Sequence, residues 1–260
     1  MLITLKDMLK KASEEGYGVI ITRCNHSGEV EAALQAAEAA KASIVLELRP
    51  DPIDIRNPSD YGIWLKKCCE SAAVPVTLSM EPEGSEEGVA EAISMGVTNI
   101  SLYEGPGRRP LSVHQLRALA EKVHTAGCSC AGKLGDREHP VDPDAAAAYV
   151  QESGIDCLAA ELVIRDESGP HVDIPRLKTL REALGTDCPL ILHGGFGLTL
   201  EQYGEACACG AAALNISKDL WKAGRDRVQT ENWDPFCSAV MAIEEALNDL
   251  ITVSGSRNRA

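Results

Sequence analysis

The segment LILHGGFGL (190–198) is the clearest candidate for a catalytic or binding role in the sequence, because a histidine ends an apolar run and glycines follow it. An imidazole can move protons or bind a metal, and a glycine backbone can approach a ligand closely. The segment LNISKDL (214–220) adds a lysine at an expected helix start, where free backbone N–H groups attract anions. We therefore expect an anion-binding site with a histidine beside it, built from His193, Gly194, Gly195, Ser217 and Lys218.

A second group of candidates consists of ionisable side chains that directly follow short apolar runs. Lys133 can form a Schiff base with a ketone if neighbouring cations or the loss of solvent lower its pKa. Tyr103 or Glu81 can then transfer protons. The alternative is that Lys133 only forms a salt bridge, with Glu81 or Asp166. The predicted catalytic residues are Lys133, Glu81, Tyr103 and His193.

Basic and amide side chains follow other apolar runs and would suit a substrate that carries phosphate or carboxylate groups. They contrast with the chain as a whole, whose formal net charge is -14. Long charged residues also begin many solvent-exposed loops, so the residues alone leave both interpretations open. Further substrate contacts are expected from Arg23, Asn25, Arg49, Arg165 and Asn215.

The elements that must position these residues are visible as eight short apolar runs, which alternate with segments of helical periodicity. Eight such units in 260 residues favour an α/β fold with a single (β/α)8 TIM barrel over 1–260. An N-terminal helix is expected at 5–15 and a C-terminal packing or oligomer helix at 235–253. The expected strands are Gly18–Thr22, Ile44–Leu48, Val76–Met80, Ile100–Tyr103, Cys128–Ala131, Cys157–Leu162, Leu190–Leu192 and Ala212–Ile216.

The barrel brings the candidate residues together, because the carboxyl ends of all its strands meet at one face, where active sites form. Each candidate lies at or shortly after the end of an expected strand. Residues far apart in the sequence are therefore expected to share one site.

Composition narrows the classes of partner. An apolar fraction of 45% supports a folded core, and the net charge of -14 disfavours nucleic acid and anionic membranes. No run reaches eighteen apolar residues, and the ten cysteines have neither zinc-binding nor disulfide spacing. We expect a cytoplasmic protein with an anionic small-molecule substrate and no nucleic-acid or membrane partner.

The sequence resembles the class II ketose-bisphosphate aldolases, which act on fructose or tagatose bisphosphates. The resemblance rests on the opening MLITLKDMLKKASEEGYGV, on VPVTLSM and AGCSCAGKLG, on the HGG and LNIS motifs, and on the ending GSRNRA. It implies a metal-dependent aldol cleavage in which three histidines hold zinc and an aspartate moves a proton.

The motifs that would carry the metal depart from this family. Its strand-three Asp-His pair, the acid/base residue and one zinc ligand, corresponds to Glu81 and Pro82. The second zinc histidine corresponds to Asp166 and the third to His193. Proline cannot bind a metal, so zinc is expected only if the family site persists.

Other family positions are also changed. A glutamate on strand five corresponds to Lys133, a strand-four aspartate to Tyr103, and the serine of the family's HGGSG to Phe196. An asparagine and a serine near the substrate correspond to Arg23 and Arg49. In the last motif Asn215 is kept, while Ser217 and Lys218 replace an aspartate and a threonine.

These observations predict an aldolase-type carbon–carbon lyase or transferase for an anionic, phosphorylated or carboxylated, ketose-like molecule, without a cofactor and without the family's zinc mechanism. Two alternatives remain open. One is a lyase that holds manganese or magnesium on Glu81, Asp166 and His193, an oxygen-rich set that suits these metals. The other is a non-catalytic aldolase-like subunit that binds a ligand or regulates. A homo-oligomer is expected in each case.

Overall fold

The computed structural model describes residues 1–49, 58–82, 84–103, 111–135, 141–230 and 234–260. Within these ranges eight parallel strands close into a barrel in the order β1-β10-β9-β6-β5-β4-β3-β2, which confirms the predicted (β/α)8 fold. The barrel strands are β1 (Val19–Arg23), β2 (Ile44–Leu48), β3 (Val76–Met80), β4 (Asn99–Leu102), β5 (Ser129–Leu134), β6 (Cys157–Glu161), β9 (Leu190–His193) and β10 (Ala211–Asn215).

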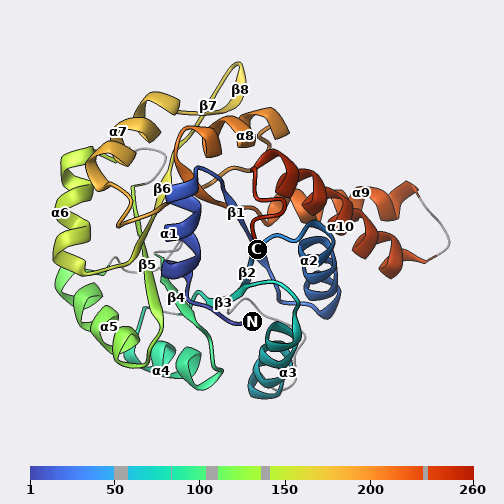
Figure 1. Cartoon of the computed structure of the whole chain (residues 1–260), viewed down its shortest axis with the longest axis horizontal. Helices are drawn as coiled ribbons and strands as arrows, with labels where there is room; N and C mark the ends of the chain where they lie inside the picture. Colours follow the sequence, from blue (N-terminus) through green and yellow to red (C-terminus); the bar gives the residue numbers. More distant parts are fainter. Residues whose placement is uncertain (50–57, 83, 104–110, 136–140, 231–233) are drawn as a thin grey trace.

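Helices surround this barrel, as Figure 1 shows. Parallel strands need such crossovers, and the helices bury the outer faces of the strands. The helices are α1 (Leu5–Glu15), α2 (Ser27–Ala40), α3 (Pro58–Ser71), α4 (Glu86–Ser94), α5 (Val113–Thr125), α6 (Pro143–Ser153), α7 (Ile174–Leu184), α8 (Leu200–Ala208), α9 (Lys218–Thr230) and α10 (Pro235–Val253).

Local sequence signals explain where these helices begin and end, and α6 is a clear case. The Asp142 side chain accepts a hydrogen bond from the Ala145 N–H at 3.0 Å, and Pro143 occupies the first turn. Gly154 ends the helix in the left-handed conformation, with φ +70°, which glycine adopts without steric cost. The two terminal helices, α1 and α10, have the ranges expected from the sequence.

Helix α1 covers the amino-terminal opening of the barrel. Its apolar face buries Leu5, Met8, Leu9 and Ala12 against side chains that fill the barrel interior. The Leu5 N–H also donates to the Ser129 hydroxyl, at the start of β5, over 3.0 Å. This opening is therefore closed by packing.

A buried carboxylate fastens α1 and α5 to the barrel. Asp156, just before β6, is 2.8 Å from Lys6 Nζ and 2.8 Å from His124 Nε2, and it accepts the Cys130 N–H at 2.8 Å. Burial alone would raise the pKa of Asp156, but these hydrogen bonds outweigh burial and lower it. Asp156 is therefore ionised and fully bonded.

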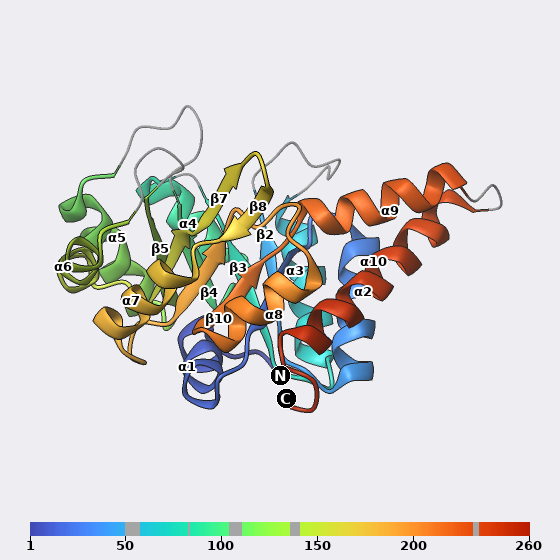
Figure 2. The same cartoon turned by 90° about the horizontal axis from the view of Figure 1, so that it is seen from above.

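Two hairpins extend beyond the barrel. The antiparallel strands β7 (Val163–Asp166) and β8 (Gly169–Val172) follow β6, and Figure 2 shows them at the end of the barrel opposite α1. Helices α9 and α10 form the second hairpin, which projects from the side of the molecule (Figures 1 and 2).

Across the described residues, no helix combines the length and the apolar character that a bilayer-spanning segment needs. All ten cysteines lie in the described ranges as free thiols.

Candidate active site

Three neighbouring strands bring a lysine, a glutamate and a histidine together at the carboxyl end of the barrel. The register pairs Glu161 of β6 with His193 of β9, and Lys133 of β5 with Ala159 of β6. Glu161 Oε2 lies 3.3 Å from His193 Nδ1 and 3.8 Å from Lys133 Nζ. The Glu161 side chain is 8% exposed and that of Lys133 is 17% exposed. The Glu161 carboxylate therefore links Lys133 and His193, two of the predicted catalytic residues.

The protonation of His193 follows from its surroundings. Burial lowers the pKa of this imidazole, the positive charges of Lys133 and Arg49 lower it further, and the hydrogen bond to Glu161 only partly opposes them. The ring is therefore neutral near pH 7. Because an ionised Glu161 can only accept a hydrogen bond, Nδ1 carries the proton and Nε2 is left as an acceptor.

A glycine makes room for this carboxylate. Gly194 has φ +80°, and a Cβ added to it would lie 2.0 Å from Glu161 Oε1. A side chain at this position would therefore displace Glu161 as well as strain the backbone. The glycine that the sequence assigned to anion binding has a second role here, because it accommodates Glu161.

Glu81 is bound to an arginine and not to Lys133. Arg49 Nε lies 2.9 Å from Glu81 Oε2 and 3.6 Å from Glu47 Oε2. Glu47 is 1% exposed, and it also accepts hydrogen bonds from Ser101 and Asn215, each over 3.2 Å. Lys133 therefore has a salt-bridge partner, as the sequence-based alternative expected, but this partner is Glu161 and not Glu81 or Asp166.

Tyr103 follows β4 and lies against the histidine. Its ring meets that of His193 edge to face, with centroids 5.8 Å apart, and the residue is 5% exposed. Burial raises the pKa of Tyr103 far above its ordinary value, and the charge of Glu47 raises it further; the nearby Ser101 hydroxyl opposes both without cancelling them. The phenol therefore stays protonated and can donate a hydrogen bond.

A cavity of about 280 Å³ opens at this face, beside His193 and Glu161. Its lining includes Arg23, Arg49, Gly194, Gly195, Phe196, Asn215, Ser217, Lys218 and Asp219. Phe196 is 43% exposed and does not close the cavity. The buried Ser217 hydroxyl has no hydrogen-bond partner among the described residues. Arginines, a lysine and this hydroxyl together form an environment that favours an anion.

Two predicted substrate-binding residues have structural contacts. The Asn25 side chain is 3% exposed and exchanges hydrogen bonds of 3.1 and 3.2 Å with the backbone of Arg49. Arg165, on β7, donates to the carbonyl oxygens of Gly194 and Phe196 over 2.9 and 2.6 Å. Asn25 thus joins the ends of β1 and β2, and Arg165 fastens the β7–β8 hairpin to the loop after β9. These contacts engage the buried Asn25 amide, while a substrate contact by the exposed Arg165 stays a prediction.

Comparison with known proteins places this architecture in a family. A family model described as Fructose-bisphosphate aldolase class-II matches residues 3–259. The chain belongs to the class II fructose-bisphosphate aldolase family. The fructose-bisphosphate aldolase of Staphylococcus aureus (strain Mu50 / ATCC 700699) is 28% identical over 287 residues, which cover 100% of this chain and 99% of that protein. The probable fructose-bisphosphate aldolase of Bacillus subtilis (strain 168) is 27% identical over 285 residues, with the same coverage.

A solved structure shows the same fold. The crystal structure of the YdjI aldolase from Escherichia coli K12 has a TM-score of 0.88 and a sequence identity of 21%, and the match covers 100% of both chains. The putative fructose-1,6-biphosphate aldolase from Coccidioides immitis has a TM-score of 0.84 at 18% identity, over 98% of this chain and 96% of that one.

This class II aldolase family member does not gather the metal ligands that the resemblance implies. Among the described residues, no group of three or more His, Cys, Asp and Glu side chains is arranged to hold a metal ion. Asp166 lies on the exposed β7–β8 hairpin, where it accepts hydrogen bonds from Ser168. The structure therefore does not bring Asp166 to Glu81 and His193, and the described residues fit neither zinc nor the alternative manganese or magnesium set.

Sequence reasoning missed two acidic residues of this family member's site. Glu161 and Glu47 each lie within an apolar run that was interpreted as a buried strand. A single carboxylate within such a run could have pointed to them. A buried charge requires a partner, so it indicates a polar cluster nearby. Glu161 is also the last residue of its strand, as His193 is of the next barrel strand.

Proposed function

We propose that this chain is a lyase that cleaves a carbon–carbon bond in an anionic, ketose-like sugar phosphate, and that Lys133 activates the ketone. Membership in the class II aldolase family supports the reaction class. The observation that carries the proposed mechanism is the position of Glu161 between Lys133 and His193, at 3.8 and 3.3 Å.

The proposed reaction begins at Lys133. Glu161 takes one proton from the ammonium group, and the free amine adds to the ketone carbon. The carbonyl oxygen takes one proton from the adding nitrogen and the other back from Glu161, and it leaves as water, while the Tyr103 hydroxyl donates a hydrogen bond to it. The product is a positively charged iminium on Lys133, so protons and charge balance against the starting ammonium and ketone.

Cleavage then requires a base on the far side of the bond that breaks. The neutral His193 can accept the proton of a hydroxyl at this carbon through Nε2. As that hydroxyl becomes an aldehyde, the electron pair of the carbon–carbon bond moves into the iminium and gives an enamine. Protonation of the enamine carbon and hydrolysis release the second product and restore Lys133.

The cavity beside these residues would hold the phosphate or carboxylate of the substrate. Backbone N–H groups near Gly194 and Gly195, the Ser217 hydroxyl and the Lys218 ammonium are the donors we assign to it. Arg23 and Arg49 also line the cavity and supply further positive charge. Glu47 and Glu81 already bind part of the Arg49 guanidinium. We therefore expect Lys218 to contribute more than Arg49 to the affinity for the substrate anion.

Activity assays with a panel of ketose phosphates, including fructose 1,6-bisphosphate, test this proposal. Lys133→Met should reduce kcat by at least about 10³-fold, because a covalent step is lost, while the exposed control Lys10→Met should retain activity. Circular dichroism checks the fold of both variants. An enzyme that keeps its activity in Lys133→Met contradicts the mechanism, and no cleavage of any ketose phosphate contradicts the lyase assignment.

A further inference from the structure

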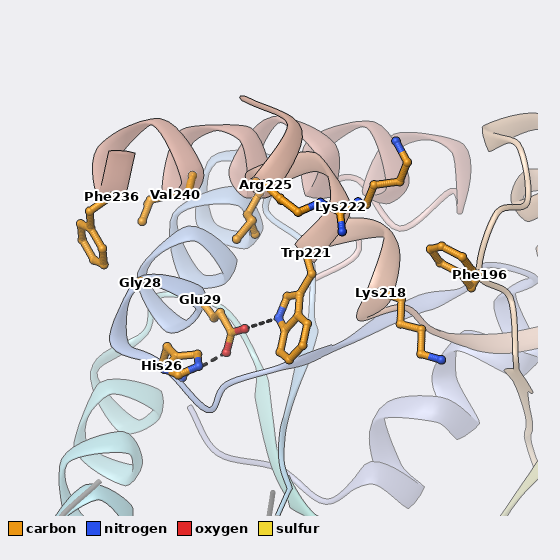
Figure 3. A pocket seen from close by; sticks show the side chains of 13 residues that line it. His26, Gly28, Glu29, Phe196, Lys218, Trp221, Lys222, Arg225, Phe236 and Val240 are labelled. Carbon is orange, nitrogen blue, oxygen red and sulfur yellow. Dashed lines mark hydrogen bonds between the residues drawn. The ribbon is translucent and has the colours of Figure 1, made fainter. Parts of the chain in front are cut away.

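A second and larger cavity, of about 720 Å³, opens beside the first. It lies between α2, α9 and α10, and Figure 3 shows its lining. Phe196 and Lys218 line both cavities, so the two are contiguous. This volume is within the range of pockets that hold small organic ligands.

An indole held in one orientation forms a wall of the second cavity. Trp221 is 44% exposed, yet its N–H donates to the carboxylate of Glu29 (Figure 3). Glu29 is 8% exposed and also accepts the His26 N–H at 3.0 Å. The guanidinium carbon of Arg23 lies 4.8 Å from the centre of the indole ring. A hydrogen bond at the ring edge and a cation near the ring therefore fix an aromatic side chain that remains open to solvent.

This fixed orientation favours binding of a flat ligand. An aromatic ring that is already immobile loses little conformational entropy when a ligand stacks on it. The wall continues onto α10, because Gly28 of α2 lies against that helix. A Cβ at Gly28 would be 2.9 Å from Val240 Cγ2 and 3.0 Å from Phe236 Cζ. Apolar side chains of α10 thus continue the surface that Trp221 begins.

Apart from Glu29, which is bound to Trp221, the charged side chains that line this cavity are positive. Lys218, Lys222 and Arg225, all on α9, line the cavity (Figure 3). Asp226 pairs with Lys222 and lies 3.6 Å from Arg225 Nε. Lys218 forms no ion pair with another described residue, and in Figure 3 it lies between Phe196 and Trp221. The cavity therefore combines an apolar, aromatic wall with an uncompensated cation at the boundary of the first cavity.

We infer that the second cavity binds the planar, apolar part of an anionic ligand whose phosphate or carboxylate interacts with Lys218. For the proposed lyase, this ligand is a substrate that carries an aromatic or similarly flat group in addition to its phosphate. That this ligand is a substrate rests on the proposed function, whereas the binding itself does not. Its test measures binding, so it can fail while the lyase assignment stands, and the reverse.

Calorimetric titration of the full chain with phenyl phosphate and with inorganic phosphate tests the inference. Phenyl phosphate should bind at least about tenfold more tightly, a difference that corresponds to about 1.4 kcal/mol. Trp221→Leu should reduce this ratio to about one and leave the affinity for inorganic phosphate within about twofold, because the variant removes the stacking surface and leaves Lys218 in place. Lys218→Met should weaken both ligands. Trp64→Leu is a matched control, since Trp64 is 38% exposed and stacks on Tyr61, outside the cavity.

Two outcomes overturn the inference. One is an equal affinity of the two phosphates for the unmodified chain. The other is a ratio that Trp221→Leu does not change. If Trp221→Leu then also changes the oligomeric state, as measured by light scattering, the cavity belongs to a contact between copies of this chain.

Discussion

Glu161 is the side chain on which the geometry of the candidate site depends, since it contacts both Lys133 and His193. Glu161→Gln keeps the shape and can still accept the His193 Nδ1 proton, but an amide cannot take a proton from Lys133. We expect kcat to fall about 10²-fold with little change in KM, the usual scale of general acid–base catalysis. Steady-state kinetics measure this, with the exposed Glu167→Gln as control. A kcat within twofold of the unmodified enzyme would show that Glu161 has no part in proton transfer.

The pH profile tests the state of His193. Its pKa is lowered from 6.5, and the proposed base is the neutral ring. Activity should therefore be constant around neutrality and fall as the pH drops through this lowered pKa. Glu161 raises the pKa of His193, so in Glu161→Gln the acid limb of kcat/KM should move to lower pH. A limb above pH 6.5 in the unmodified enzyme, or one that Glu161→Gln leaves in place, would contradict this account.

Single residues were only partly predictable from the sequence. Lys133 and His193 were predicted as catalytic because each follows or ends an apolar run, and the fold places both at the barrel mouth. Their common partner was not identified, because a carboxylate within an apolar run resembles a strand residue until its neighbours are known. The pairing of Glu81 with Arg49 likewise depends on side-chain distances that no spacing in the sequence encodes.

Among the structural elements, α1 and α5 depend on Asp156 for their attachment to the barrel. Asp156→Asn should lower the free energy of unfolding at pH 7 by about 2 kcal/mol, because buried donors lose a charged acceptor. The folded-state pKa of Asp156 is lowered, so its contribution is complete above the ordinary value of 3.8 and is lost as the pH falls through the folded-state pKa.

Urea unfolding at pH 7 and at pH 3 measures this contribution. The difference between the unmodified chain and Asp156→Asn should be smaller at pH 3 than at pH 7. Asp166→Asn, on the exposed hairpin, should leave stability unchanged at both. A difference that is independent of pH would mean that the ionised form of Asp156 is not what fastens these helices.

The elements themselves were largely predictable, and the reasons are physical. Strands β2 and β3 have the expected bounds because their apolar runs are buried on both faces, and α6 follows its cap and its proline. The β7–β8 hairpin was missed, since Val163 and Val172 are its only buried strand residues and the others provide no apolar alternation. The cavity between α2 and α9 was also unpredictable, because it depends on how helices from opposite ends of the chain pack.

At the scale of the whole molecule, the account predicts that the protein does not require zinc. His193 is the remaining family zinc ligand in the described ranges, and one imidazole cannot hold the ion tightly. Elemental analysis of protein purified without added metal should find well below one zinc per chain, and treatment with EDTA should change neither activity nor Tm. One tightly held zinc per chain, lost together with activity in EDTA, would restore the metal mechanism of the family.

The account as a whole rests on a covalent bond between Lys133 and the substrate. Borohydride reduces an iminium irreversibly, so incubation with borohydride and a cleavable ketose phosphate should inactivate the enzyme and leave the substrate's carbon skeleton attached to the chain. Peptide mass spectrometry should locate this adduct on Lys133, and Lys133→Met should show none. An active enzyme that remains active and unmodified under these conditions would contradict the central claim and leave Lys133 as the ion-pair partner of Glu161.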